Sequence, residues 1–193
     1  MPSLGNEAAA FAVVAWFVVI TACCVAVSVD VRFRRIPNKL TLPLWVAGIM
    51  VGLFQNGLNG LGESLGGMAI AGLPFFLLFM VSGTGAGDAK MMFAIGAWLG
   101  IRDAFIATVA VGVAGGILSL FYAMGHGRLL ITLMNTAWMT VTLPLVVLGP
   151  GRWQDRLKLV PPSGDGPLKT PYSLAMLAGT CAAATWVWIC AAT

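Results

Sequence analysis

This sequence carries very little charge. Only 9% of its 193 residues are Asp, Glu, Lys or Arg, whereas 59% are hydrophobic. Soluble domains carry roughly a quarter charged residues, so this chain has too few to cover a surface that faces water. Its apolar runs of about 20 residues have the length of a helix that crosses a bilayer. The composition therefore excludes a soluble domain and predicts an integral membrane protein.

The apolar runs also lack the alternation of polar and apolar residues that the strands of a membrane β-barrel require. Backbone groups in lipid must then be satisfied within helices. We therefore predict an all-α, polytopic bundle of about six transmembrane helices. The glycine-rich stretch Gln55–Ser64 is predicted to be a loop. The expected spans are Ala8–Val29, Lys39–Gln55, Leu65–Ser82, Ala89–Ile101, Ala104–Met124 and Tyr172–Ala191.

Signals for cleavage, metal binding and disulfides are lacking as well. The first apolar run is too long for a cleaved signal and follows no basic segment, so we expect it to be retained as a span. The four cysteines lie in apolar runs without CxxC spacing, which favours packing over zinc binding or disulfides. His126 has no second ligand in view and is expected in a solvated loop. We predict no metal and no cofactor.

The basic residues orient the spans. A cluster in the first connection, Arg32, Arg34, Arg35 and Lys39, places that loop in the cytoplasm by the positive-inside rule. The N-terminus then lies outside, and Lys90 lies inside. Membrane topology explains the net charge of +4 better than a nucleic-acid partner does. The oligomeric state is not indicated.

One stretch, Leu129–Leu148, has two possible placements. It is apolar, but it contains a proline and several threonines that suit a lipid-facing span poorly. If it crossed, the basic residues of the segment after it would all be external, against the positive-inside rule. We therefore treat residues 1–193 as one transmembrane domain in which residues 129–170 form a cytoplasmic or interfacial segment. A model with seven spans stays open.

Two acidic residues stand out because they lie at the ends of apolar runs. Asp30 closes the first run, and Asp88 lies in the sequence SGTGAGDAKMM between the third and fourth spans. Charges at bilayer depth are costly and usually have a function. The predicted topology puts both acids on the cytoplasmic side, where they could approach each other. Two close carboxyl groups that share one proton can activate water and protonate a carbonyl, which is aspartic-protease chemistry.

Simpler structural explanations exist for these residues. Asp30 could pair with Arg34 across one helical turn, and Asp88 could cap the fourth helix. The glycines before Asp88 permit unusual backbone angles and close approach of a substrate strand. Lys90 could support the ionised carboxylate or bind the substrate backbone. The sequence GTGAGDAK is not a phosphate loop, because the Lys-Ser/Thr pair is missing.

The order of these motifs is more specific than each one alone. Asp30 precedes an Ile-Pro-Asn element at residues 36–38, a Gly-Ala-Gly-Asp-Ala-Lys element follows at residues 85–90, and a Pro-Tyr pair at residues 171–172 precedes the last span. This order resembles the type IV prepilin peptidase family, above all its short TadV/CpaA-like members, which serve Flp-type (Tad) pili. The resemblance covers Val25–Leu99 and resumes at Lys169–Gly179. It implies Asp30 and Asp88 as catalytic residues, with substrate-binding or supporting roles for Lys90, Gly85, Gly87, Pro37 and Asn38.

The resemblance also implies a function. The chain would be an aspartic endopeptidase of the bacterial inner membrane that removes the basic leader of prepilin-like proteins at the cytoplasmic face, commonly after a glycine. Its partners would be those substrates and membrane lipid. Large members carry a cytoplasmic domain with cysteine pairs that methylates the new N-terminus. The short connection Val31–Asn38 has no such domain, so we expect proteolysis without methylation. Ser173 stands where relatives usually have glycine.

Two other functions are compatible with intramembrane acids. A small proton- or ion-coupled transporter subunit could use Asp30 and Asp88 to carry its ion, although the sequence shows no inverted repeat. A structural subunit of a secretion machine could use both acids as helix caps. Loss of the leader from a pilin precursor separates the protease from both alternatives.

Overall fold

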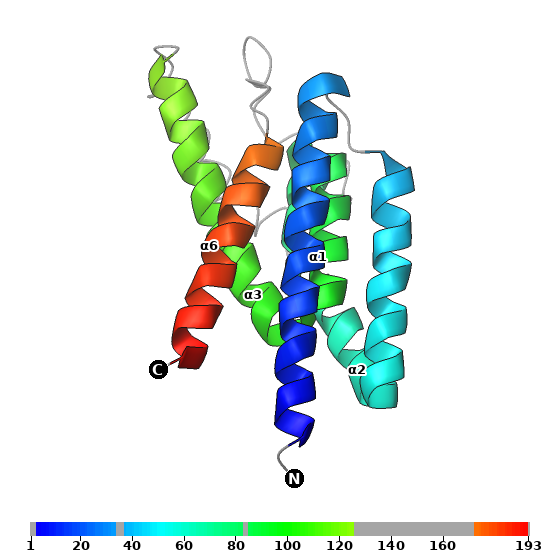
Figure 1. The fold of residues 1–193 in the computed structure, drawn as a ribbon. Coiled ribbons are helices and arrows are strands. Elements are labelled where there is room, and N and C mark those ends of the chain that lie inside the picture. Colours follow the sequence, from blue (N-terminus) through cyan, green and yellow to red (C-terminus); the bar gives the residue numbers. More distant parts are fainter. Residues whose placement is uncertain (1–2, 34–36, 83–84, 126–171, 193) are drawn as a thin grey trace, which may run out of the picture. The chain divides into compact units, whose positions relative to one another are not determined.

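The computed structural model describes residues 3–33, 37–82, 85–125 and 172–192, and all of its elements are helices. They are α1 (Ser3–Phe33), α2 (Asn38–Ser82), α3 (Ala86–Gly125) and α6 (Tyr172–Ala192) (Figure 1). Each of the four contains a stretch that is long and apolar enough to cross a membrane. The chain is therefore a polytopic helical membrane protein, as its composition predicts. The ambiguous stretch Leu129–Leu148, and the first three residues of Lys169–Gly179, lie outside the described residues.

Helix α2 is interrupted at two residues. Its 45 residues would reach about 68 Å as one straight helix, roughly twice the thickness of a hydrocarbon core. Asn56 (φ −125°, ψ 17°) and Gly57 (φ 57°, ψ −135°) leave the helical conformation. Beyond them the chain runs back alongside the first segment. The evidence is a hydrogen bond of 3.4 Å from the Ser64 hydroxyl to the carbonyl of Gly48. Helix α2 is therefore a hairpin of two helical segments.

The predicted loop Gln55–Ser64 is wrong in its extent. Only Asn56 and Gly57 are non-helical, and the helix resumes directly after them. A Cβ atom on Gly60 would overlap the carbonyl of Gly52. The glycine at position 60 thus serves close packing of the two helical segments rather than a turn, and this explains why composition alone gave too long a loop.

Helix α3 is interrupted once. Its 40 residues break at Gly100, where φ is 70° and ψ is −179°. This left-handed φ favours glycine, which has no Cβ atom to clash. The break lies near the predicted boundary between the spans Ala89–Ile101 and Ala104–Met124. The prediction left two residues between these spans, whereas in the structure one non-helical residue, Gly100, separates the two helical segments.

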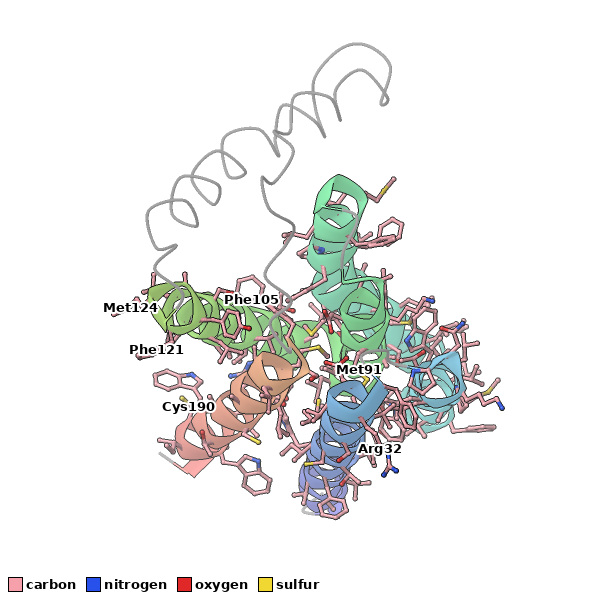
Figure 2. All side chains as sticks on the ribbon, turned by 90° about the horizontal axis from the view of Figure 1, so that it is seen from above. Arg32, Met91, Phe105, Phe121, Met124 and Cys190 are labelled. Atoms are coloured by element: carbon pink, nitrogen blue, oxygen red, sulfur yellow. The ribbon has the colours of Figure 1, made fainter. Side chains whose placement is uncertain are left out.

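The chain forms two compact units, residues 1–115 with 171–193, and residues 116–170. In the first unit α1 and α6 run in opposite directions and pack against each other (Figure 1). Two contacts set their register, Asp30 with Ser173 and Cys23 with Thr180. The buried core of this unit contains Val19, Met91, Met92, Ile95 and Met176. Figure 2 shows Met91 between the helices and the side chain of Arg32 pointing outward.

Large apolar side chains also cover the outside of the first unit. Phe17 is 71% exposed and Phe54 is 83% exposed. A surface of this kind faces lipid at no cost, whereas water would disfavour it. The exposed apolar residues therefore agree with a membrane environment.

Candidate active site

Asp30 lies in the last turn of α1, where it is half-buried. Its Oδ2 atom accepts a hydrogen bond of 2.7 Å from the hydroxyl of Ser173. Ser173 is the second residue of α6 and only 1% exposed. The end of α1 and the beginning of α6 thus meet at this carboxyl group.

Asp88 lies in the first turn of α3 and is also half-buried. The residue before this helix, Gly85, has a left-handed φ of 88°, and its carbonyl accepts a hydrogen bond of 3.0 Å from the amide of Ala89. A Cβ atom on Gly85 would lie 3.4 Å from Oδ2 of Asp88. Glycine therefore supplies the turn into the helix and keeps the space beside this carboxyl group open.

The two carboxyl groups lie close enough for the charge of Asp30 to act on Asp88. The side chain of Tyr172 lies near enough to Asp88 to feel its charge as well. The ring of Tyr172 packs edge-on against Phe75, with their centroids 6.0 Å apart. Three helices, α1, α3 and the beginning of α6, therefore contribute polar groups to one site.

The remaining predicted site residues lie around this pair. Lys90 is half-buried on α3, and its ammonium group donates a hydrogen bond of 2.9 Å to Oδ1 of Asn38. Asn38 begins α2, directly after Pro37, and the Pro37 carbonyl accepts a bond of 3.0 Å from the amide of Leu40. Gly87 is half-buried in the first turn of α3. The structure thus joins Asn38 of the Ile-Pro-Asn element to Lys90 of the Gly-Ala-Gly-Asp-Ala-Lys element.

The simpler explanations for the two acids can be compared with this geometry. Asp88 is the third residue of α3, and Gly85 precedes the helix, so Asp88 does not occupy the N-cap position. Arg34, the possible partner of Asp30, lies outside the described residues. Among the described residues no group of three or more His, Cys, Asp or Glu side chains is arranged to hold a metal ion.

Sequence reasoning did not predict the partnership between Ser173 and Asp30. These residues are 143 positions apart, and Ser173 attracted notice only as a departure from the glycine of relatives. A serine at the start of an apolar helix has several structural uses. Only the antiparallel packing of α1 and α6 shows which carboxyl group it reaches.

Comparison with known proteins gives a family for this arrangement. The model of the type IV leader peptidase family matches residues 17–120, more than half of the chain. This range includes Asp30, Pro37, Asn38, Gly85, Gly87, Asp88 and Lys90. No solved structure matches the chain significantly.

Curated relatives match over a similar stretch. A prepilin leader peptidase/N-methyltransferase of Xanthomonas campestris pv. campestris is 28% identical over 119 residues, which cover 58% of this chain and 41% of that protein. Proteins of the same name from two strains of Burkholderia pseudomallei are 34% identical over 110 residues, which cover 53% of this chain and 35% of theirs. The matched stretch is thus less than half of each relative. Because the family model covers most of the described helical core, this chain belongs to the type IV leader peptidase family.

Proposed function

We propose that this chain is a membrane aspartic endopeptidase that removes the basic leader from Flp-type prepilins at the cytoplasmic face, with Asp30 and Asp88 as its catalytic pair. The observation that supports the proposal is that these two carboxyl groups, from the end of α1 and the start of α3, lie within electrostatic reach of each other. Membership of the type IV leader peptidase family supports the same activity.

The chemistry follows from two carboxyl groups that share one proton. The ionised group takes a proton from a water molecule, whose oxygen attacks the carbonyl carbon of the scissile peptide bond. The protonated group donates its proton to the carbonyl oxygen. As the C–N bond of the tetrahedral intermediate breaks, the leaving amine accepts the proton that the first carboxyl group took from water, and a hydroxyl proton of the intermediate returns to the second carboxyl group. We assign these two roles to the pair and not to either aspartate alone.

The surroundings suit a peptide substrate. Gly85 has no side chain beside Asp88, and we propose that an extended substrate strand lies there, since peptide bonds must leave the helical conformation to be cleaved. We propose that the Lys90 ammonium, held by Asn38, binds the backbone carbonyls of that strand. Gly87 and Pro37 support the turns that begin α3 and α2.

We further propose six spans, with α2 and α3 each crossing the membrane twice. The break at Asn56 and Gly57 and the break at Gly100 would lie on the external side. The exposed basic residues Arg32 and Lys39 would lie on the cytoplasmic side, in agreement with the positive-inside rule. The catalytic pair would then face the cytoplasm of a cell whose inner membrane holds the chain.

The absence of N-methylation is part of the proposal. Helix α1 ends at Phe33 and α2 begins at Asn38, so the connection between them is too short for a methyltransferase domain. The curated relatives, whose names include the methyltransferase, are much longer than the stretch they share with this chain. Both features favour the short Tad-type members of the family.

The direct test is co-expression with a Flp-type prepilin, a precursor with a basic leader that ends in glycine before an apolar helix. The wild-type chain should shorten the precursor, and Asp30→Asn and Asp88→Asn should not. Asp103→Asn is the matched control, since Asp103 is a half-buried acid on α3. Mass spectrometry of the product should show an unmethylated N-terminus. Processing by both catalytic variants would refute the proposal, and ion flux lost in these variants would support a transporter instead.

A further inference from the structure

The hydroxyl of Ser173 is directed differently from several other helical hydroxyls in the described part of the chain. Thr21, Ser28, Thr108 and Thr180 each donate to a carbonyl four residues earlier on their own helix. Ser173 is the second residue of α6, so no helical carbonyl of α6 lies four residues before it. Its hydroxyl donates across to α1 instead, to Oδ2 of Asp30. The position of this serine at the helix start therefore makes it available to the carboxyl group.

The packing of α1 on α6 fixes this contact. Cys23 and Thr180 face each other with 3.8 Å between Sγ and Oγ1. This second pair is seven positions from Asp30 on α1 and seven from Ser173 on α6. Seven residues are about two helical turns, so both pairs lie on the same seam. The Asp30 carboxyl group is thus held by a rigid neighbour rather than by a loop.

A carboxyl group that activates water must be fixed in orientation as well as in position. Asp30 is near the end of α1 and half-buried, and its carboxyl group could rotate without a partner. The 2.7 Å bond from Ser173 occupies one oxygen. Hydrogen bonds to charged acceptors are short and strong, so this contact restricts the rotation and leaves Oδ1 for the water.

We infer that Ser173 is a positioning residue of the protease: its hydroxyl holds Oδ2 of Asp30 so that Oδ1 is presented to the attacking water between the two aspartates. This inference rests on the proposed function. Ser173 touches neither substrate nor water and acts through Asp30 alone.

The kinetic test uses the full chain in detergent micelles with the Flp-type precursor as substrate. Ser173→Ala should lower kcat about 10- to 100-fold, the loss expected for one hydrogen bond to a charged group. KM should stay within about twofold, because binding of the substrate does not involve this hydroxyl. Ser173→Thr keeps a hydroxyl on the same carbon and should restore most of kcat. Thr185→Ala removes an exposed hydroxyl of α6 that bonds only within its own helix, to the carbonyl of Ala182, and should leave both constants near those of the wild type.

Two results would overturn the inference. One is a kcat of Ser173→Ala close to that of the wild type. The other is a loss that Thr185→Ala shares or that Ser173→Thr does not relieve, since either would indicate general damage to α6. These results differ from failure of the proposed function, in which the wild-type chain does not cleave the precursor or Asp30→Asn still does.

A cross-linking test checks the contact without activity. In a chain whose four cysteines are replaced by serine, Asp30→Cys with Ser173→Cys should form a disulfide when a mild copper oxidant is added. Asp30→Cys with Thr180→Cys should not, because about two helical turns separate these positions. A chain that keeps Cys23, has its other three cysteines replaced by serine and carries Thr180→Cys is the positive control, because these two positions face each other in the structure. If the control pair joins and the first pair does not, the inference fails.

Discussion

The ammonium group of Lys90 donates a hydrogen bond of 2.9 Å to Oδ1 of Asn38, which is 52 positions earlier in the chain. This bond joins the beginning of α3 to the beginning of α2. The backbone of Lys90 is also held, because its carbonyl accepts a bond of 2.7 Å from Nε1 of Trp45. A cation is therefore fixed on the same helical turn as Asp88.

This arrangement predicts that Asn38→Ala weakens cleavage without abolishing it. The loss of one hydrogen bond at an exposed position should lower the initial cleavage rate about two- to tenfold. Lys90→Met should lower it further, because the charge itself is removed. Lys39→Met, which removes an exposed neighbouring lysine, is the control and should cleave normally. A wild-type rate for Asn38→Ala beside an inactive Lys90→Met would show that Lys90 acts without this tether.

The sequence predicted the membrane class, and it drew attention to the two acids for a simple reason. In a chain with so little charge, an acid at the end of an apolar run is conspicuous, as Asp30 and Asp88 are. Their chain positions, together with the positive-inside rule, placed them on one side of the membrane. The structure brings them within electrostatic reach of each other. The contact between Ser173 and Asp30 was not predictable.

The helix boundaries were harder to predict because glycine has two uses in this protein. Gly57 and Gly100 have left-handed φ angles and interrupt helices. Gly60 and Gly67 stay helical and lie against another helical segment. Composition cannot separate these cases, since both need a residue without a Cβ atom, one for the backbone angle and one for close packing. Only the positions of neighbouring helices distinguish them.

The close packing of Gly67 and Gly96 gives a stability prediction. A Cβ atom on Gly96 would overlap the carbonyl of Gly67, and it would lie 2.8 Å from the amide nitrogen of Met68. Gly96→Ala should therefore force the second segment of α2 away from α3 and lower the free energy of unfolding by about 1–3 kcal/mol. The check is the temperature of half-unfolding in detergent micelles.

Gly112→Ala is the matched control for this prediction. It changes the same residue type on the same helix, but no atom lies within 4 Å of the added Cβ. Because alanine is the better helix former, this variant should be as stable as the wild type or up to about 1 kcal/mol more stable. Equal loss of stability in Gly96→Ala and Gly112→Ala would mean that the tight crossing of the two helices does not exist.

The break at Gly100 predicts a local effect of Glu63. Its Oε2 atom accepts a hydrogen bond of 3.1 Å from the amide of Ile101, the first residue after the break. Such an amide has no partner within its own helix. In Glu63→Ala the Ile101 amide should exchange its hydrogen for deuterium about tenfold faster, and in Glu63→Gln it should exchange near the wild-type rate. Unchanged exchange in Glu63→Ala would contradict the role of this side chain as a cap.

The proposed double crossing of α2 can be tested by labelling single cysteines in intact cells. The first segment of α2, Asn38–Gln55, has 18 residues, or about 27 Å of helix, which suits a hydrocarbon core of roughly 30 Å. Lys39 lies at one end of this segment and Asn56 follows the other, and both are exposed. The two positions should therefore lie on opposite sides of the membrane.

In a chain whose native cysteines are replaced by serine, a maleimide that cannot cross the inner membrane should label Asn56→Cys from outside. It should label Lys39→Cys only after the inner membrane is opened. A single crossing by the whole of α2 would instead bury Asn56 in lipid, where a cysteine reacts slowly from either side because thiolates form poorly without water. Labelling of both positions from one side would contradict the two crossings, and it would remove the reason for placing the Asn38–Lys90 contact and the catalytic pair at the cytoplasmic face.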